Sequence, residues 1–431
     1  MLAILLGTGL YFSIRTGFIQ IFKFKAIMKE TIIKSLKKRH VKKDSGSITP
    51  FQALSTALAG TIGTGNIAGV ATAITIAGPG AIFWMWVSAF FGMMIKYAEI
   101  VLAIKYRKKN SHGEWIGGPM IFIEVGLNMK WLACVYAFLG VVASFGVGNM
   151  TQANSIASAM RDAFNVCPLT TGIILSVLVG ITVAGGIRKI ASITEKVVPL
   201  MSIFYIASAM LVILFNIKNV PSVAALILTS AFKPFAPIGG LAGVTVATAI
   251  QKGVSRGIFT NEAGLGSASI AHAAADTDHP SRQGLWGIFE VFFDTIVMCS
   301  ITAFAILVTE KWTGGLTGSS LTVSAFDTVL HGVGKYVVAI SLAFFAFSSI
   351  LAWSLYGKRC VEYMVGEKYN KYYLFVFLLA IVLGSVAELH LVWEISDALN
   401  GLMVIPNLIG LIGLSGVVIS TTREGMKKMK L

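Results

Sequence analysis

Charged residues are scarce in this chain of 431 residues, because Asp, Glu, Lys and Arg together make up only 13% of it. An average soluble domain has about 25%. Hydrophobic residues make up 55% of the chain, and its mean hydropathy is +0.78. This composition excludes an ordinary soluble globular protein and predicts an all-α membrane protein that crosses the bilayer several times.

Cysteine and histidine are also rare, with four and six copies. Cys134 and Cys299 fall inside apolar segments, and the four cysteines predict no disulfide framework. The histidines are scattered, and the chain contains neither a G-x-S-x-G nor an H-E-x-x-H motif. The sequence therefore predicts no enzyme. The rival class is an enzyme or receptor with a membrane-embedded pocket.

Apolar runs close to membrane-spanning length recur along the chain. Ten core helices are expected at 52–77, 81–106, 131–160, 169–186, 197–215, 241–275, 285–308, 334–357, 372–387 and 397–419. The apolar start, Met1–Ile14, rises only about 21 Å at 1.5 Å per residue. We interpret it as the visible end of an eleventh helix. A signal peptide is the alternative, but no basic region precedes this segment and no small-residue cleavage site follows it.

Basic residues outnumber acidic residues by 35 to 20, which gives a net charge of +15. If the ten core helices alternate in direction, 27 of the Lys and Arg residues fall on one side and five on the other. This positive-inside pattern predicts a multi-pass protein of the cell membrane with both core termini in the cytoplasm. Membrane lipid is thus an expected partner. No motif for reading or stacking bases accompanies the charges, so nucleic acid is not.

The first core segment, 52–77, is interrupted by the helix-breaking run from Gly60 to Asn66. Backbone groups released there would face a ligand, and the amides at the start of the following half-helix would favour a carboxylate. Close packing of helices through small residues is the alternative. We predict a substrate site whose members here are Thr61, Gly63, Thr64, Gly65 and Asn66.

The sixth core segment, 241–275, has a second polar stretch at Gly253-Val254-Ser255-Arg256-Gly257. We expect its helix to unwind there, so that carbonyls at Gly253, Ser255 and Gly257 accept from an ammonium group. Lys252 and Arg256 would need partners inside the bilayer. The carboxylates of Glu290 and Asp294 share one helix face and form either a structural ion pair or a proton or cation relay.

Interruptions in the first and sixth of ten helices predict an inverted five-plus-five repeat, the architecture of many secondary transporters. The expected organisation is an extra N-terminal transmembrane helix (1–14), a basic cytoplasmic segment (15–51), a first repeat (52–216), an extracellular loop (217–240), a second repeat (241–419) and a basic cytoplasmic tail (420–431). In the third core helix, Gln152 and Asn149 are candidate substrate contacts, although buried amides also join helices to each other.

Four motifs carry a resemblance to a known family: GTGNIAG at 63–69, GPGAIFWMWVSAFFGMMIKYAE at 78–99, GGPM at 117–120 and GVSRGIFTNEAGLGSASIAHAAA at 253–275. Together they resemble the alanine/glycine:cation symporter family of the amino acid–polyamine–cation superfamily. The resemblance spans nearly the whole chain. It implies the leucine-transporter-type fold, symport with a sodium ion, and a small neutral amino acid, alanine or glycine, as substrate.

The eighth core helix carries two adjacent hydroxyls, Ser348 and Ser349, followed by Trp353. Hydroxyls in an apolar helix commonly bond back to their own helix. The adjacent pair also resembles the superfamily's shared sodium site, and a hard cation prefers oxygen ligands. The resemblance implies a five-oxygen sodium site made by Ala59, Ile62, Phe345, Ser348 and Ser349.

Trp353 is expected to form a lid or floor of the substrate pocket, with an interfacial aromatic as the alternative. The alternative mechanism is a proton-coupled amino-acid transporter of the same fold that uses Asp294 or Glu290. His272, Asp276 and His279 have helical spacing, but a helix end is favoured over a metal site there. The preference among glycine, L-alanine and D-alanine stays open, as does the oligomeric state.

Overall fold

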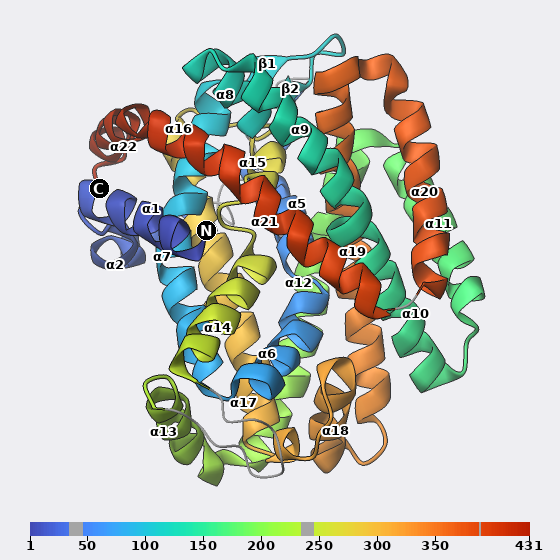
Figure 1. The fold of residues 1–431 in the computed structure, drawn as a ribbon. Helices are drawn as coiled ribbons and strands as arrows, with labels where there is room; N and C mark the ends of the chain where they lie inside the picture. The colour runs from blue at the N-terminus through green and yellow to red at the C-terminus, as the bar shows by residue number, and fades with distance from the viewer. Residues whose placement is uncertain (34–45, 234–244, 388) are drawn as a thin grey trace.

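The structure is a computed structural model that describes residues 1–33, 46–233 and 245–431, apart from residue 388 and the side chains of residues 388–397. Parts of the predicted segments 15–51 and 217–240, and the beginning of the predicted core helix 241–275, lie outside the described residues. The remainder is almost entirely helical, as the composition predicts (Figure 1).

The first five core helices follow the predicted order. They are α5 (Pro50–Thr61) with η2 (Gly65–Gly69) and α6 (Val70–Ala77), then α7 (Gly80–Lys105), then α9 (Lys130–Phe145) with η3 (Gly146–Met150) and α10 (Thr151–Phe164), then α11 (Pro168–Val183) and α12 (Gly186–Phe215). The short helix α8 (Pro119–Leu127) follows a two-stranded hairpin of β1 (Lys108–Lys109) and β2 (Trp115–Ile116).

The second five core helices repeat this succession. They are α14 (Val246–Asn261) with α15 (Ser267–His272), then α16 (Pro280–Val291) with η5 (Phe292–Cys299) and α17 (Ser300–Leu307), then α19 (Gly334–Val365), α20 (Asn370–Val386) and α21 (Leu389–Gly413) with α22 (Ser415–Met429). The short helix α18 (Gly318–Leu330) stands between the second and third members, as α8 does in the first half. The succession is that of a five-plus-five repeat.

Shorter elements complete the chain. The N-terminal elements are α1 (Leu2–Arg15), α2 (Ile19–Phe22), α3 (Phe24–Met28) and η1 (Lys29–Ile33). The predicted loop 217–240 carries η4 (Ile217–Asn219) and α13 (Val220–Ser230), and the turns η6 (Lys311–Thr313) and η7 (Glu367–Tyr369) flank α18 and α20. Helical structure thus continues into segments that connect the core helices.

Spanning length can be judged for the described residues. Six helices are long and apolar enough to cross a membrane, or eight if each of two bent pairs is one span. The predicted number of about eleven spans stays a prediction. The tenth predicted helix, 397–419, is corrected in one respect: the chain bends by 63° between α21 and α22, because the helix ends at Gly413 and a new one begins at Ser415.

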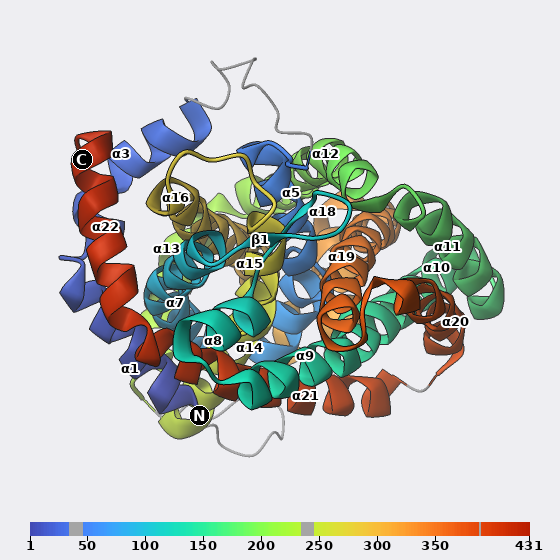
Figure 2. The same cartoon turned by 90° about the horizontal axis from the view of Figure 1, so that it is seen from above.

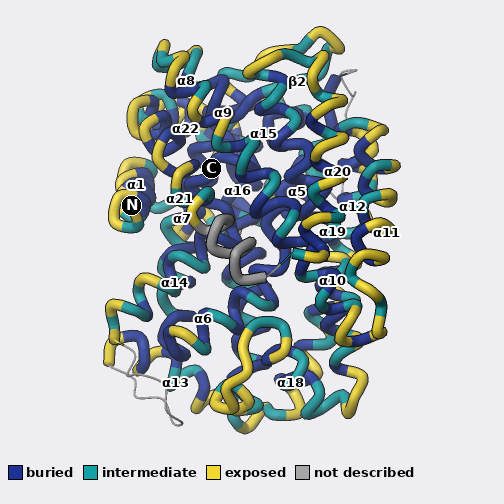
Figure 3. The backbone as a smooth tube through the Cα atoms, turned by 45° about the vertical axis from the view of Figure 1, so that its right-hand side comes forward, coloured by how far each residue is buried: buried dark blue, intermediate teal, exposed yellow. Residues whose placement is uncertain are grey.

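The broken helices lie inside the molecule. Seen from above, α5 and α15 are near the middle, whereas α11, α20, α21 and α22 lie at the periphery (Figure 2). Buried residues follow the inner helices, and exposed residues mark the outer ones (Figure 3). Apolar side chains such as Ile173, Leu178 and Phe375 are at least half exposed. An apolar outer surface of this kind suits contact with lipid.

Local sequence sets the ends of the first broken helix. Thr49 and Gln52 form a reciprocal capping box at the start of α5, and Pro50 occupies its first turn. At the far end, Gly78 ends α6 with a φ of 71°, a conformation that favours glycine. The capping box and Gly78 thus mark the two ends of the first broken helix, and the interruption lies between them.

Candidate substrate and ion site

The predicted interruption of the first core helix is confirmed. α5 ends at Thr61, η2 begins at Gly65, and the two halves are bent by 51°. The Asn66 side chain holds the bend, because its Oδ1 accepts from the Gly63 amide at 2.9 Å, while the Asn66 amide donates to the Gly63 carbonyl at 3.3 Å. The Gly63 amide is therefore turned away from the Ala59 carbonyl, which it would bond in a continuous helix.

The paired serines of α19 lie against this released backbone. Ser348 Oγ is 3.5 Å from the Ala59 carbonyl oxygen and donates to the Phe345 carbonyl at 2.8 Å, and Ser349 Oγ donates to the same carbonyl at 3.1 Å. Four members of the predicted sodium site are thus together. The fifth, Ile62, is buried at the bend with a ψ of 91°, so its carbonyl also leaves the helical pattern.

Gly63 brings the serines close to Gln152. A Cβ atom on Gly63 would lie 2.7 Å from Ser349 Oγ and 3.3 Å from Gln152 Oε1, so a larger residue here would displace these two side chains. Gln152 Oε1 accepts from the Thr64 amide at 3.4 Å. The Thr64 hydroxyl is fully buried and has no hydrogen-bond partner among the described residues. A buried unpaired hydroxyl is costly, and a polar ligand would satisfy it.

Three other predicted substrate contacts, Thr61, Asn66 and Asn149, form hydrogen bonds within their own helix or to a neighbouring helix. Thr61 Oγ1 donates back to the Leu58 carbonyl at 3.4 Å. The side-chain nitrogen Nδ2 of Asn66 donates to Asp294 Oδ1 at 2.7 Å, and this bond connects η2 to η5. Asn149 Nδ2 donates to the Phe377 carbonyl of α20 at 2.7 Å. This last bond favours the interhelical alternative for Asn149.

Trp353 joins α19 to η3 and to Glu262. Its side chain is 1% exposed, and its Nε1–H donates to Glu262 Oε1 at 2.8 Å. The indole packs on Gly148 of η3, where a Cβ atom would lie 2.2 Å from the tryptophan side chain. The interfacial alternative for Trp353 is therefore wrong, because the ring lies in the interior.

The predicted position of the second interruption is wrong. α14 runs without a break through Gly253, Ser255 and Gly257 to Asn261. The two glycines instead allow close packing on α7, because a Cβ on Gly253 would lie 2.4 Å from the Ala81 carbonyl oxygen and one on Gly257 would lie 2.6 Å from Ser88 Oγ. The carbonyls of Gly253, Ser255 and Gly257 lie within a continuous helix. They are therefore not released to accept from an ammonium group, as the prediction required.

The interruption lies instead at Glu262–Gly266, between α14 and α15. Glu262, Gly264 and Gly266 all have positive φ, at 53°, 96° and 77°. A buried glutamate in this conformation is unusual. The signal in the sequence was a second G-x-G, Gly264-Leu265-Gly266, which matches Gly63-Thr64-Gly65 of the first interruption.

Two buried charged residues near this second interruption, Lys96 and Glu99, were not predicted as site residues. Glu99 Oε1 accepts from the amides of Gly264 and Gly266 at 2.9 and 3.1 Å and from Asn407 Nδ2 at 2.7 Å. Glu99 is fully buried. The charged residues Lys96 and Glu99, which stand in the interior of the apolar run 81–106, were the available signal.

Glu290 has other partners than the predicted ones. Its carboxylate lies 3.3 Å from Lys96 Nζ and 3.1 Å from His272 Nε2, and all three side chains are buried. Asp294 accepts from Asn66 and Thr295. Neither Lys252 nor Arg256 is needed for these contacts. Glu290 thus forms an ion pair with Lys96.

Comparison with known proteins identifies the chain. The sequence model described as "Sodium:alanine symporter family" matches residues 1–431. The chain belongs to the sodium:alanine symporter family. This confirms the resemblance that the motifs indicated, and it makes the protein a transporter rather than an enzyme.

Curated relatives in the sodium:alanine symporter family match over nearly the whole chain. The sodium/alanine symporter AgcS of Methanococcus maripaludis is 48% identical over 98% of this chain and 93% of its own length. An uncharacterized transporter of Haemophilus influenzae is 46% identical over 100% and 94%. The probable sodium/glutamine symporter GlnT of Bacillus subtilis is 38% identical over 100% and 88%.

Solved structures confirm the leucine-transporter-type fold class. The structure of MhsT in complex with L-phenylalanine matches with a TM-score of 0.61 at 14% identity, over 88% of this chain and all of that chain. A Na⁺-coupled sialic acid symporter matches with a TM-score of 0.58 at 12% identity, over 94% and 86%. These identities support the fold alone. Membership of the transporter family, together with the apolar helices, shows a multi-pass membrane protein.

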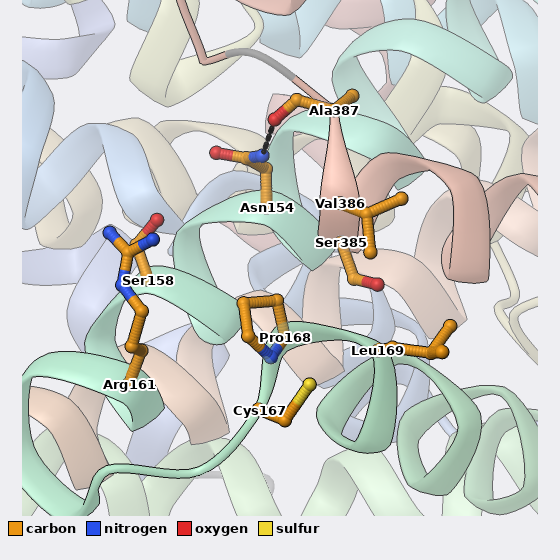
Figure 4. A pocket seen from close by; sticks show the side chains of 9 residues that line it. All are labelled: Asn154, Ser158, Arg161, Cys167, Pro168, Leu169, Ser385, Val386 and Ala387. Atoms are coloured by element: carbon orange, nitrogen blue, oxygen red, sulfur yellow. Dashed lines mark hydrogen bonds between the residues drawn. The ribbon is translucent and has the colours of Figure 1, made fainter.

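A cavity of about 440 Å³ in this sodium:alanine symporter family member lies apart from the interruptions. It is lined where α10, α11 and α20 meet, by residues that include Asn154, Arg161 and Cys167 (Figure 4). Asn154 Nδ2 donates to the Ala387 carbonyl at 2.7 Å across it. It contains none of the predicted site residues.

The histidines near α15 have structural partners. His272 bonds Glu290 and, at 2.8 Å, Gln283, and the His279 ring accepts from the Ser281 amide at 3.2 Å at the start of α16. Among the described residues no cluster of three His, Cys, Asp or Glu side chains could hold a metal ion. α15 ends at His272 and α16 begins at Pro280, so this segment is a helix end and a turn, as predicted.

Proposed function

We propose that this protein couples the uptake of a small neutral amino acid, alanine or glycine, to sodium ions, by alternating access around the first interruption. The observation that carries the proposal is the meeting of Ala59, Gly63 and Thr64 with Ser348, Ser349 and Gln152 at one buried point. It combines carbonyl and hydroxyl oxygens, which a hard cation prefers, with amide and hydroxyl donors, which a carboxylate prefers.

The proposed sodium site comprises the carbonyls of Ala59, Ile62 and Phe345 and the hydroxyls of Ser348 and Ser349. The first helix and α19 belong to different repeats, and an ion between them would hold the two together. Binding of sodium would then stabilise the arrangement that binds substrate, and by linkage substrate would tighten sodium binding by the same factor.

The proposed substrate site comprises Gly63, Thr64, Gly65 and Gln152, with Trp353 as its aromatic wall. The Thr64 hydroxyl supplies an unpaired donor. Phe259 and Thr260 lie on the other side, since a Cβ on Gly65 would be 3.1 Å from Phe259 Cδ1 and 2.8 Å from Thr260 Cγ2. Such close walls favour a small substrate. The names of relatives add support, since AgcS is called a sodium/alanine symporter.

A proton-coupled carrier remains the second candidate, because three buried carboxylates, Glu99, Glu262 and Glu290, surround the second interruption with Lys96. Buried ionisable groups in membrane proteins often mark ion pathways. A Bacillus subtilis relative, 38% identical, is called a putative sodium/proton-dependent alanine carrier protein.

The two candidates separate in proteoliposomes that contain the purified full chain. Uptake of radiolabelled alanine is measured at fixed pH with an inward sodium gradient, with choline in place of sodium, and with an inward proton gradient in choline. The sodium proposal expects accumulation only with sodium. Equal accumulation with the proton gradient in choline would contradict it and favour the proton-coupled carrier.

A further inference from the structure

A basic cavity of about 370 Å³ lies between the N-terminal and C-terminal helices, outside the transport site. Arg15 at the end of α1 and Lys23 after α2 line one side of it, and Arg423 and Lys427 of α22 line the other. Neither Asp nor Glu is among the residues that line it. We call this cavity the basic groove.

The four cations are available to a ligand. All four are exposed, and none forms an ion pair with another described residue. Glu424, next in sequence to Arg423, pairs with His279 at 3.7 Å. Arg423 and Lys427 are one helical turn apart, and like charges at this spacing repel each other. An anion between the helices would relieve this repulsion.

The walls of the basic groove are apolar. Ile19 and Phe22 contribute from α2, and Ile419 and Met426 from α22. The Phe22 side chain is 76% exposed. α22 turns away from α21 by 63° and lies along the edge of the molecule beside α1 (Figure 2). A dissolved inorganic anion gains nothing from contact with apolar walls. A phospholipid presents a phosphate next to hydrocarbon, so it can contact the cations and the apolar walls together.

We propose that the basic groove binds the phosphate headgroup of an anionic phospholipid, with its acyl chains along Phe22 and the outer face of α2. Basic pockets between helices at the membrane surface are suited to this chemistry. The headgroup would tie α1 to α22. α1 also reaches the second interruption, because a Cβ on Gly264 would lie 2.6 Å from Leu5 Cδ1. The bound lipid would thus stabilise a helix that supports the transport site.

Native mass spectrometry of the detergent-purified full chain tests the proposal. The protein is titrated with dioleoylphosphatidylglycerol, with dioleoylphosphatidylcholine of the same chain length, and with inorganic phosphate as competitor. Phosphatidylglycerol should bind preferentially. R423Q/K427Q should weaken its binding by about twenty-five-fold, because each basic residue near an anionic lipid contributes about fivefold. Millimolar phosphate should displace little of the lipid.

The matched control is K428Q/K430Q, which removes the same charge from exposed residues of α22 and its end that do not line the basic groove. Its phosphatidylglycerol affinity should stay within about twofold of the wild type. Equal losses in the two double variants, or equal binding of the two lipids, would overturn the proposal. Displacement of the lipid by phosphate alone would also overturn it, since the groove would then be a site for free anions.

Discussion

At the scale of single residues, Trp353 of α19 connects η3 to the second interruption. Its ring packs on Gly148, and its indole nitrogen donates to Glu262, which has a left-handed backbone in the second interruption. The Glu262 carboxylate also accepts from the Ser267 hydroxyl. Glu262 is therefore a positioning residue for the aromatic wall of the proposed substrate site.

Removing the ring should widen substrate selection. Trp353→Ala should admit larger neutral amino acids such as leucine, because one methylene in a tight apolar pocket typically changes affinity by about 1–3 kcal/mol. Trp353→Phe keeps a ring but leaves Glu262 Oε1 without its indole donor, so the ranking of alanine over leucine should weaken rather than disappear. Competition against labelled alanine gives the ranking. The same ranking in all three proteins would show that Trp353 does not line the site.

The paired serines provide the residue-scale test of sodium binding. Ser348→Ala with Ser349→Ala removes two of five proposed oxygen ligands, and each lost contact to a charge costs about 1.5–3 kcal/mol. We expect alanine affinity at low sodium to fall by roughly tenfold or more and to recover partly at high sodium. Isothermal titration of alanine at several sodium concentrations measures this.

Ser341→Ala is the matched control, since Ser341 lies in the same helix, is equally buried and, among the described residues, bonds only back to Val337 at 2.8 Å. Its sodium dependence should equal that of the wild type. An unchanged sodium dependence in the double serine variant would move the ion elsewhere, towards Asn66 and Asp294.

At the scale of elements, the two interruptions are held by different means. The first is closed by the Asn66 side chain of its own helix. The second is held from outside, because Glu99 of α7 and Asn407 of α21 bond the backbone at Gly264 and Gly266. Released backbone groups inside a membrane must find such partners.

Gly65 lets the first broken helix approach the sixth. A Cβ there would lie 2.8 Å from Thr260 Cγ2, so Gly65→Ala should reduce alanine binding by about tenfold and Gly65→Val should abolish it. Gly69→Ala is the matched control in the same element, because nothing lies within 4 Å of its added Cβ. Binding is measured by substrate-induced thermal stabilisation of purified protein. Wild-type affinity in a folded Gly65→Val protein would refute the carboxylate site.

At the scale of the whole molecule, an ion-pair network ties the loop after α7 to the end of α19. Arg359 donates to Glu362 at 2.6 Å and also bonds Glu114. Burial alone would raise the pKa of Glu114, but the Arg359 guanidinium outweighs this and holds the pKa below its ordinary value. The pair joins segments 245 residues apart in sequence.

The sign of the pH dependence follows. Because the folded pKa of Glu114 is lowered, its contribution to stability is present above the ordinary carboxyl pKa of about 4.5 and is lost as the pH falls through the folded value. Between pH 6 and pH 3, the Tm of Glu114→Gln should fall less than the Tm of the wild type. The difference should be small, because Glu114 is partly exposed. Parallel Tm curves would show that the pair contributes nothing.

The sequence by itself determined the class of the protein, the order of its helices, the first interruption and the paired serines. Apolar length and helix-breaking glycines are local properties, so a single chain displays them directly. The G-x-G pair at Gly264 and Gly266 is also visible in the sequence. The polar run at Gly253–Gly257, however, favours an interruption there in its place.

Only the tertiary structure decided which residues contact the glycines and the buried charged side chains. Whether a glycine releases the backbone or admits a neighbouring helix depends on what packs against it, and Gly253 and Gly257 proved to be contacts of α7. The same holds for charge: Lys96 pairs with Glu290, and Glu99 bonds the second interruption, across long separations in sequence. Hydrogen bonds and ion pairs between distant residues arise from the packing of helices, which no local pattern records.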